Sequence, residues 1–178
     1  MSSQSPTDTP AAFMPSFNPR VVFAMLAGVV APIIALDQVS KLYVRAHMQL
    51  YENIQLIPNW LDITYTRNPG VAFSMFASAP EGARTALLLV LASAAIMVLV
   101  VLIAAADHPT LVTVALALIL AGAGGNLIDR ATRGEVIDFV RAHYYSYNWP
   151  IFNVADSSIS IGVTLILLSS IFSKPDPQ

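Results

Sequence analysis

The sequence predicts an α-helical membrane protein with four transmembrane helices and a small β-sheet between the first and second helices. Hydrophobic residues make up 56% of the 178 residues and charged residues only 11%, whereas about a quarter of a soluble domain is charged. Four apolar runs each approach the roughly 20 residues that are needed to cross a bilayer. The stretch between the first two runs instead alternates apolar and polar residues, as strands do.

The first span follows a tail, residues 1–18, that is rich in Ser, Pro and Thr and is expected to be disordered. Residues 21–36 carry no charge, and the apolar run reaches a full span at Val44. A cleavable signal peptide is the alternative. It is disfavoured because the long region before the run has a single basic residue, Arg20, and no small-residue cleavage site follows the run.

Three further spans are expected at residues 85–106, 110–128 and 150–172. Glycines near the end of the third would allow close helix packing: Gly122, Gly124 and Gly125. Residues 19–173 therefore form one integral membrane domain, in which residues 48–84 are the sheet segment, and residues 174–178 form a short polar tail.

Within the sheet segment, the stronger alternation covers residues 61–66 and a weaker one covers 54–56, with Pro58-Asn59 between them. Asn68-Pro69-Gly70 is a turn signal, after which residues 71–73 resume an extended or buried path. The Asn68 side chain either shapes this turn or supplies an amide that holds a substrate backbone.

Several classes of protein and site are disfavoured by composition. The net charge is −2 without a basic cluster, so no nucleic-acid partner is expected. The absence of cysteine excludes disulfides, thiolate zinc sites and cysteine nucleophiles. The three histidines match no metal-ligand spacing, so we expect no metal and no other cofactor.

All eight Trp and Tyr residues fall in or next to the loops after the first and third spans, which share one side of the membrane: Tyr43, Tyr51, Trp60, Tyr65, Tyr144, Tyr145, Tyr147 and Trp149. Such rings favour the membrane–water interface. Most Lys and Arg residues also lie on this side, which the positive-inside rule would place in the cytoplasm. Because several of these cations neighbour acids or asparagines and could be internal partners, charge alone leaves the orientation open.

Asp138 and Asp156 are the candidate working acids. Asp138 is flanked by apolar residues, which raise the pKa of a carboxyl group and suit a general acid; an exposed loop position is the alternative. Asp156 and Asn153 begin the fourth span, either only as a capping box or also as site residues. The positive end of that helix favours an ionised Asp156, which suits a base. Together they resemble the acid pair of an aspartic protease.

Two further groups carry ionisable residues near the membrane, where charge is costly and suggests function. Asp37 and Lys41 are spaced i, i+4 and share a helix face, as a structural ion pair or as part of the site. Asn126, Asp129 and Arg130 also face one way, and the neighbouring arginine predicts an ionised Asp129. Two roles remain open for Asp129: it could form a structural ion pair at the end of a helix, or it could take part in catalysis.

Five runs in order resemble the lipoprotein signal peptidase (signal peptidase II) family of intramembrane aspartic peptidases, over nearly the whole chain after residue 20. The matching runs are Asp37-Gln-Val-Ser-Lys41, Asn68-Pro-Gly-Val-Ala-Phe-Ser74, Gly125-Asn-Leu-Ile-Asp-Arg130, Val136-Ile-Asp-Phe139 and Phe152-Asn-Val-Ala-Asp156. Pro69 and Val71 stand where the family more often has other small residues, which blurs the turn geometry.

The resemblance implies a bacterial inner-membrane aspartic endopeptidase that cleaves prolipoproteins before the diacylglyceryl-modified cysteine. Asp138 and Asp156 would be catalytic, and the other matched positions would bind substrate or support the site: Asp37, Lys41, Asn68, Gly70, Asn126, Asp129, Arg130, Asn153 and Ala155. The termini would be cytoplasmic, and the sheet and active site would lie at the extracytoplasmic face. Implied partners are lipidated prolipoproteins, membrane lipid and globomycin-type peptide inhibitors, with the protein a monomer.

Two other classes compete with the peptidase. A small carrier could use intramembrane carboxylates as a proton relay, but four spans without an inverted repeat or a broken helix pair argue against it. A non-catalytic membrane scaffold would not need carboxylates gathered at one face.

Overall fold

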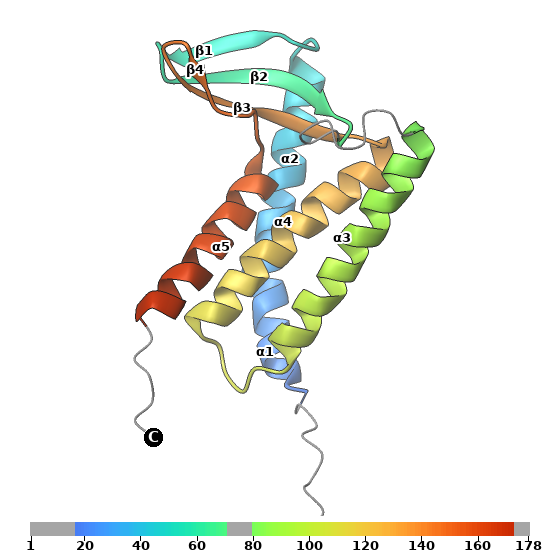
Figure 1. The fold of residues 1–178 in the computed structure, drawn as a ribbon, viewed down its shortest axis with the longest axis vertical. Helices are drawn as coiled ribbons and strands as arrows, with labels where there is room; N and C mark the ends of the chain where they lie inside the picture. The colour runs from blue at the N-terminus through green and yellow to red at the C-terminus, as the bar shows by residue number, and fades with distance from the viewer. Residues whose placement is uncertain (1–16, 71–79, 173–178) are drawn as a thin grey trace, which may run out of the picture.

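Four helical segments, each long and apolar enough to cross a membrane, carry a four-stranded sheet at one end (Figure 1). The computed structural model describes residues 17–70 and 80–172. The helices are α1 (Pro19–Met25), the π-helical η1 (Leu26–Val30), α2 (Ala31–His47), α3 (Glu81–Ala104), α4 (Leu111–Arg133) and α5 (Val154–Phe172). The predicted fold class is confirmed. The start of α1 and the end of α5 both lie at the end of the bundle opposite the sheet.

The first helical segment is continuous from α1 through η1 to α2, so the expected span extends by a few residues at both ends. Asn18 caps it: its Oδ1 accepts from the Arg20 and Val21 backbone N–H groups at 3.2 and 3.4 Å. Pro19 follows at the first helical position, where its missing N–H costs nothing. The tails expected at residues 1–18 and 174–178 lie almost entirely outside the described residues.

The sheet joins two hairpins that are far apart in sequence. Its antiparallel strands lie in the order β1 (Asn53–Ile57), β2 (Leu61–Asn68), β3 (Val136–Tyr144) and β4 (Tyr147–Asn148). The two strands expected between the first and second spans are confirmed, while β3 and β4 were not predicted. The first four residues of β3 are all buried. A strand that is buried on both faces lacks the alternation of apolar and polar residues by which a strand is recognised in a sequence. The expected path of residues 71–73 lies outside the described residues.

The start of α5 is fixed by the sheet. Phe152 N–H donates to the Val140 carbonyl at 3.0 Å, and Val140 N–H donates to the Phe152 carbonyl at 2.8 Å. The chain before Val154 is therefore extended, so the helix is shorter than the span expected from residue 150 and begins directly after Asn153, the residue read as a helix cap from the sequence. This bridge brings the first turn of α5 against β3.

Helices α4 and α5 pack closely because small residues face one another. A Cβ built on Gly122 would lie 2.6 Å from Ser158 Oγ, and one on Gly162 would lie 2.6 Å from the Ala115 carbonyl oxygen. A Cβ on Gly125 would lie 2.6 Å from Asp37 Oδ2, so this glycine lets α2 approach α4 at the polar centre of the molecule. The expected close approach at the glycines of the third span is thereby confirmed.

Gly162→Ala should destabilise the bundle, because the added methyl group meets backbone atoms of α4 that cannot move aside. Overpacking of this kind costs about 1–3 kcal/mol and should lower the thermal unfolding temperature in detergent. Gly28→Ala is the matched control, since a Cβ there has no atom of the described residues within 4 Å. Equal unfolding temperatures for the two variants would contradict the close packing.

Candidate active site

A fully buried lysine lies between α2 and α4. Lys41 Nζ is 2.8 Å from Asp37 Oδ2 and 2.9 Å from Asp129 Oδ2, and all three side chains have no exposed surface. It also donates to Asn126 Oδ1 at 3.1 Å. A buried charge is tolerated only when it is paired and hydrogen-bonded. Lys41 thus satisfies two acids and orients an asparagine.

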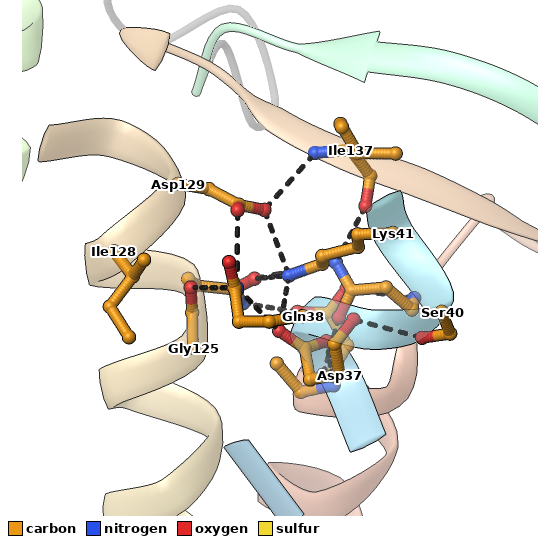
Figure 2. A network of polar contacts seen from close by, with 12 residues as sticks. Asp37, Gln38, Ser40, Lys41, Gly125, Ile128, Asp129 and Ile137 are labelled. Carbon is orange, nitrogen blue, oxygen red and sulfur yellow. Dashed lines mark hydrogen bonds and ion pairs between the residues drawn. The ribbon is translucent and has the colours of Figure 1, made fainter. Parts of the chain in front are cut away.

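Further donors complete the surroundings of Asp129 (Figure 2). Gln38 Nε2 lies 3.2 Å from Asp129 Oδ1, 3.1 Å from Asp37 Oδ2 and 3.2 Å from the Gly125 carbonyl oxygen. Ile137 N–H donates to Asp129 Oδ2 at 3.4 Å, and Arg133 forms an ion pair with Oδ1. The side chain is therefore enclosed by donors from α2, α4 and β3.

The arginine paired with Asp129 is Arg133, one turn further along α4, and not the adjacent Arg130 that the sequence suggested. Acid and base at i, i+4 share a helix face, so the spacing itself carried this signal. Arg130 is half-buried beside Gly70, and its Nη1 lies 3.5 Å from the Asn126 carbonyl oxygen. Its charge interacts with the carboxylates of Asp156, Asp138 and, without a direct ion pair, Asp129.

The side chains just described form a polar cluster of Asp37, Gln38, Lys41, Asn126 and Asp129. This cluster also holds the first turn of α5. Asp37 Oδ1 accepts from the buried Ala155 N–H at 2.9 Å. Asn153 Oδ1 accepts from Asp156 N–H at 2.9 Å, and Asp156 Oδ2 accepts from Asn153 N–H at 3.3 Å. The capping box is therefore present, and Asp156 also lines the pocket described below.

Three asparagines hold the carboxyl groups of Asp138 and Asp156. Asn153 Nδ2 donates to Asp138 Oδ1 at 2.6 Å, and Asn68 Nδ2 donates to Asp138 Oδ2 at 3.0 Å. Asn126 Nδ2 donates to Asp156 Oδ1 at 2.8 Å. Asn153 bonds to Asp138 through its side chain and to Asp156 through its backbone. Each of the four carboxyl oxygens thus has a donor, and the two acids are linked through one residue.

Asn68 reaches Asp138 from the end of β2. Its Oδ1 accepts from Gly70 N–H at 2.9 Å, and Gly70 adopts a φ of 81°, which glycine tolerates best. The pairing of Thr66 with Asp138 and of Asn68 with Val136 sets this register. Asn68 therefore shapes the turn, which confirms the first of the two readings considered for it, and its amide group also contacts Asp138.

Asp138 and Asp156 line one pocket of about 530 Å³. Asp138 is buried and Asp156 half-buried. The remaining lining residues come from β2, the segment before α5 and α5 itself: Asn68, Trp149, Pro150, Ile151, Phe152, Ser157, Ser160 and Ile161. Apart from Asn68, none of these was predicted as a site residue. The Val140–Phe152 bridge that brings the segment before α5 here is a tertiary contact, whereas Ser160 stands at i+4 from Asp156 on α5, a spacing visible in the sequence.

Burial raises the pKa of Asp138 to about 6, and the nearby negative charge of Asp156 acts in the same direction. Hydrogen bonds from Asn68 and Asn153 oppose the rise, because they stabilise the ionised form. The raised pKa expected for Asp138 from its apolar neighbours is confirmed.

Within residues 17–70 and 80–172, no group of three or more His, Cys, Asp or Glu side chains is arranged to hold a metal ion.

The model of the family described as signal peptidase (SPase) II matches residues 29–172. The chain belongs to this family. A lipoprotein signal peptidase of Syntrophus aciditrophicus is 42% identical over 157 residues, which cover 86% of this chain and 94% of that protein. One of Staphylococcus aureus is 36% identical over 137 residues, covering 77% and 82% of the two chains.

Two solved bacterial membrane enzymes share the fold of this signal peptidase II family member. One, determined at 2.3 Å, has a TM-score of 0.72 and 30% identity and covers 92% of this chain and 96% of its own. The other, determined at 1.9 Å, has a TM-score of 0.73 and 29% identity, with 90% and 99% covered. The chain is therefore a multi-pass bacterial membrane protein of a peptidase family.

Proposed function

We propose that this protein is an aspartic endopeptidase that removes the signal peptide from prolipoproteins by cleaving before the diacylglyceryl-modified cysteine. The observation that carries the proposal is the placement of Asp138 and Asp156 in one pocket, with every carboxyl oxygen bonded to a donor. The relatives named lipoprotein signal peptidase support the choice of substrate.

The reaction needs one acid protonated and one ionised. A water molecule between the carboxyl groups gives a proton to Asp156 as its oxygen attacks the scissile carbonyl carbon, while Asp138 protonates the carbonyl oxygen. The tetrahedral intermediate then breaks its carbon–nitrogen bond. The proton on Asp156 passes to the departing cysteine nitrogen, and Asp138 recovers its proton from the hydroxyl group.

The other matched residues position this pair. Lys41, Asp37 and Asp129 anchor α2 and α4 against the first turn of α5, which carries Asp156. Asn68 lines the pocket beside Asp138, and Gly70 follows it in the same turn. Their donors and acceptors would hold an extended segment beside Asp138, with the lipid chains of the substrate remaining in the bilayer.

We place the termini in the cytoplasm and the sheet and pocket at the extracytoplasmic face. The exposed Trp60, Tyr144 and Trp149 suit a membrane–water interface at the sheet end of the helices, and the resemblance to the signal peptidase II family is the ground for taking this interface as the extracytoplasmic one. We further propose that the protein acts as a monomer and is inhibited by globomycin-type peptides bound in the same pocket. A thiol-reactive reagent that cannot cross membranes, applied to whole cells with single cysteines at Trp60 or Asp107, tests the orientation: only the cysteine at Trp60 should react.

The proposed activity is tested with purified protein in detergent and two synthetic precursors that differ only in the diacylglyceryl group on the cysteine. We expect cleavage of the lipidated precursor, with a product that begins at the modified cysteine when analysed by mass spectrometry. Equal cleavage of the unmodified peptide, or cleavage at another bond, would contradict the proposed specificity.

The pH dependence follows from the raised pKa of Asp138. As the general acid, Asp138 must be protonated, so kcat/KM should fall as the pH rises above about 6. Asn68→Ala removes a hydrogen bond that stabilises the ionised form, so the pKa should rise and the alkaline limb should move up by about one pH unit. Asn148→Ala, at an exposed asparagine of β4, is the control. An unmoved limb, or one moved to lower pH, would exclude Asp138 as the acid.

A further inference from the structure

A second groove, of about 640 Å³, lies between α2 and the sheet and has no part in the proposed chemistry. Its walls are mainly apolar side chains from α2, β1, β2 and β3, among them Val39, Tyr43, Ile54, Leu56, Ile63 and Phe139. Among the residues that the structure describes, no Asp, Glu, Lys or Arg side chain lines it. An apolar groove of this size needs an apolar occupant.

We propose that this groove binds one acyl chain of a bilayer lipid. The groove starts on the face of α2 that meets the membrane: Leu36, Val39 and Tyr43 belong to the first candidate span and are 56%, 63% and 64% exposed. Apolar side chains exposed on a membrane-spanning helix contact lipid. The groove continues this lipid-facing surface upward beneath the sheet, so an acyl chain can enter it without crossing water.

The sheet turns an apolar face toward the same space. Ile54 and Leu56 line the groove from β1 and are 45% and 54% exposed, whereas Gln55 between them points to the opposite face. Ile63, which pairs with Ile54, extends this apolar face onto β2. Leaving these side chains in water would be unfavourable, and a lipid chain removes them from water.

The rim argues for a chain and against a headgroup or a peptide. Tyr43 and His47 stack at a centroid distance of 4.2 Å at the end of α2, the level at which aromatic rings favour the interface. A charged headgroup would find no counter-ion among the described residues that line the groove, so it remains at or outside this rim. A peptide backbone would bring amide groups into a space with few partners for them, which is costly.

An acyl chain in this groove would pack against the strand that carries Asp138. Phe139 lines the groove, and the preceding residue, Asp138, lines the catalytic pocket on the other face of β3. Adjacent residues of a strand point to opposite faces, so the two sites share one strand. The bound lipid would therefore support β3 from the side opposite the reacting groups.

Because the chain has no cysteine, a fluorescent label on Ile54→Cys can report occupancy without side reactions. The protein in detergent is titrated with a phospholipid that carries a nitroxide in mid-chain. We expect saturable quenching of this label and little quenching of a label on Gln55→Cys, on the opposite face of β1. Val39→Trp, which fills the groove, should abolish the saturable quenching at Ile54→Cys; if it fails to fold, as judged by circular dichroism, Ile63→Phe replaces it.

Three outcomes would overturn the proposal. Equal quenching at both labelled positions would mean that the sheet is simply immersed in the micelle. Strong quenching of Ile54→Cys by soluble iodide in the presence of saturating lipid would mean that the groove holds water. A label protected from both quenchers would mean that protein, such as a second copy of the chain, covers the groove. None of these measurements depends on peptidase activity.

Discussion

Asp138→Asn and Asp156→Asn are each expected to abolish cleavage of a lipidated precursor, while the variant protein still inserts into the membrane and purifies. Asparagine keeps the shape of the side chain but can serve neither as an acid nor as a base. Loss of one positioned proton-transfer group costs about 10²- to 10⁴-fold in rate. The measurement is the initial rate of cleavage at equal amounts of folded protein.

The controls separate catalysis from structure. Asp107→Asn changes an exposed aspartate at the opposite end of the helices and should leave the rate unchanged. Normal cleavage by either Asp138→Asn or Asp156→Asn would contradict the assignment of the pair.

Lys41→Met is expected to be the most destabilising single change in the polar cluster. It leaves Asp37 and Asp129, both fully buried, without the cation that lies within 2.9 Å of each. Removing one partner of a buried ion pair costs about 3–5 kcal/mol. The thermal unfolding temperature in detergent should fall sharply, and cleavage should fall with it because Asn126 loses a donor.

Arg45→Met is the matched control, one helical turn along α2. Arg45 is exposed and has no hydrogen-bond or ion-pair partner among the described residues. Its substitution should change the unfolding temperature little, as is usual for an exposed charge. Equal unfolding temperatures for the two variants would show that the Lys41 cluster does not hold the helices together.

The helices could be predicted from the sequence, because a long uncharged run is stable in a bilayer only as a helix. Half of the sheet could not be predicted. Strands β1 and β2 alternate apolar and polar residues, so their period is visible. The start of β3 is buried continuously, and its pairing with β2 joins residues about 70 positions apart. The extended path of residues 150–152 was missed for a similar reason, because the bridge from Phe152 to Val140 is a tertiary contact, although the capping box at Asn153 marked where α5 begins.

In the candidate site, residue types were easier to predict than partners. The apolar neighbours of Asp138 indicated its raised pKa, and Asn153 with Asp156 had the spacing of a capping box. Arg133 was overlooked in favour of the adjacent Arg130, although i, i+4 spacing pointed to it. Gln38 carried no signal beyond its place next to Asp37, since its contacts with Asp129 and Gly125 depend on how α2 meets α4.

The central claim is that Asp138 and Asp156 activate a water molecule that attacks the scissile carbonyl directly. A single turnover of lipidated precursor in water enriched in ¹⁸O tests it, with both peptide products and the enzyme examined by mass spectrometry. We expect one ¹⁸O atom in the new carboxyl terminus of the released signal peptide and none in the enzyme. An unlabelled signal peptide together with ¹⁸O in Asp138 or Asp156 would mean that an aspartate attacks the carbonyl itself, and would contradict the proposed mechanism.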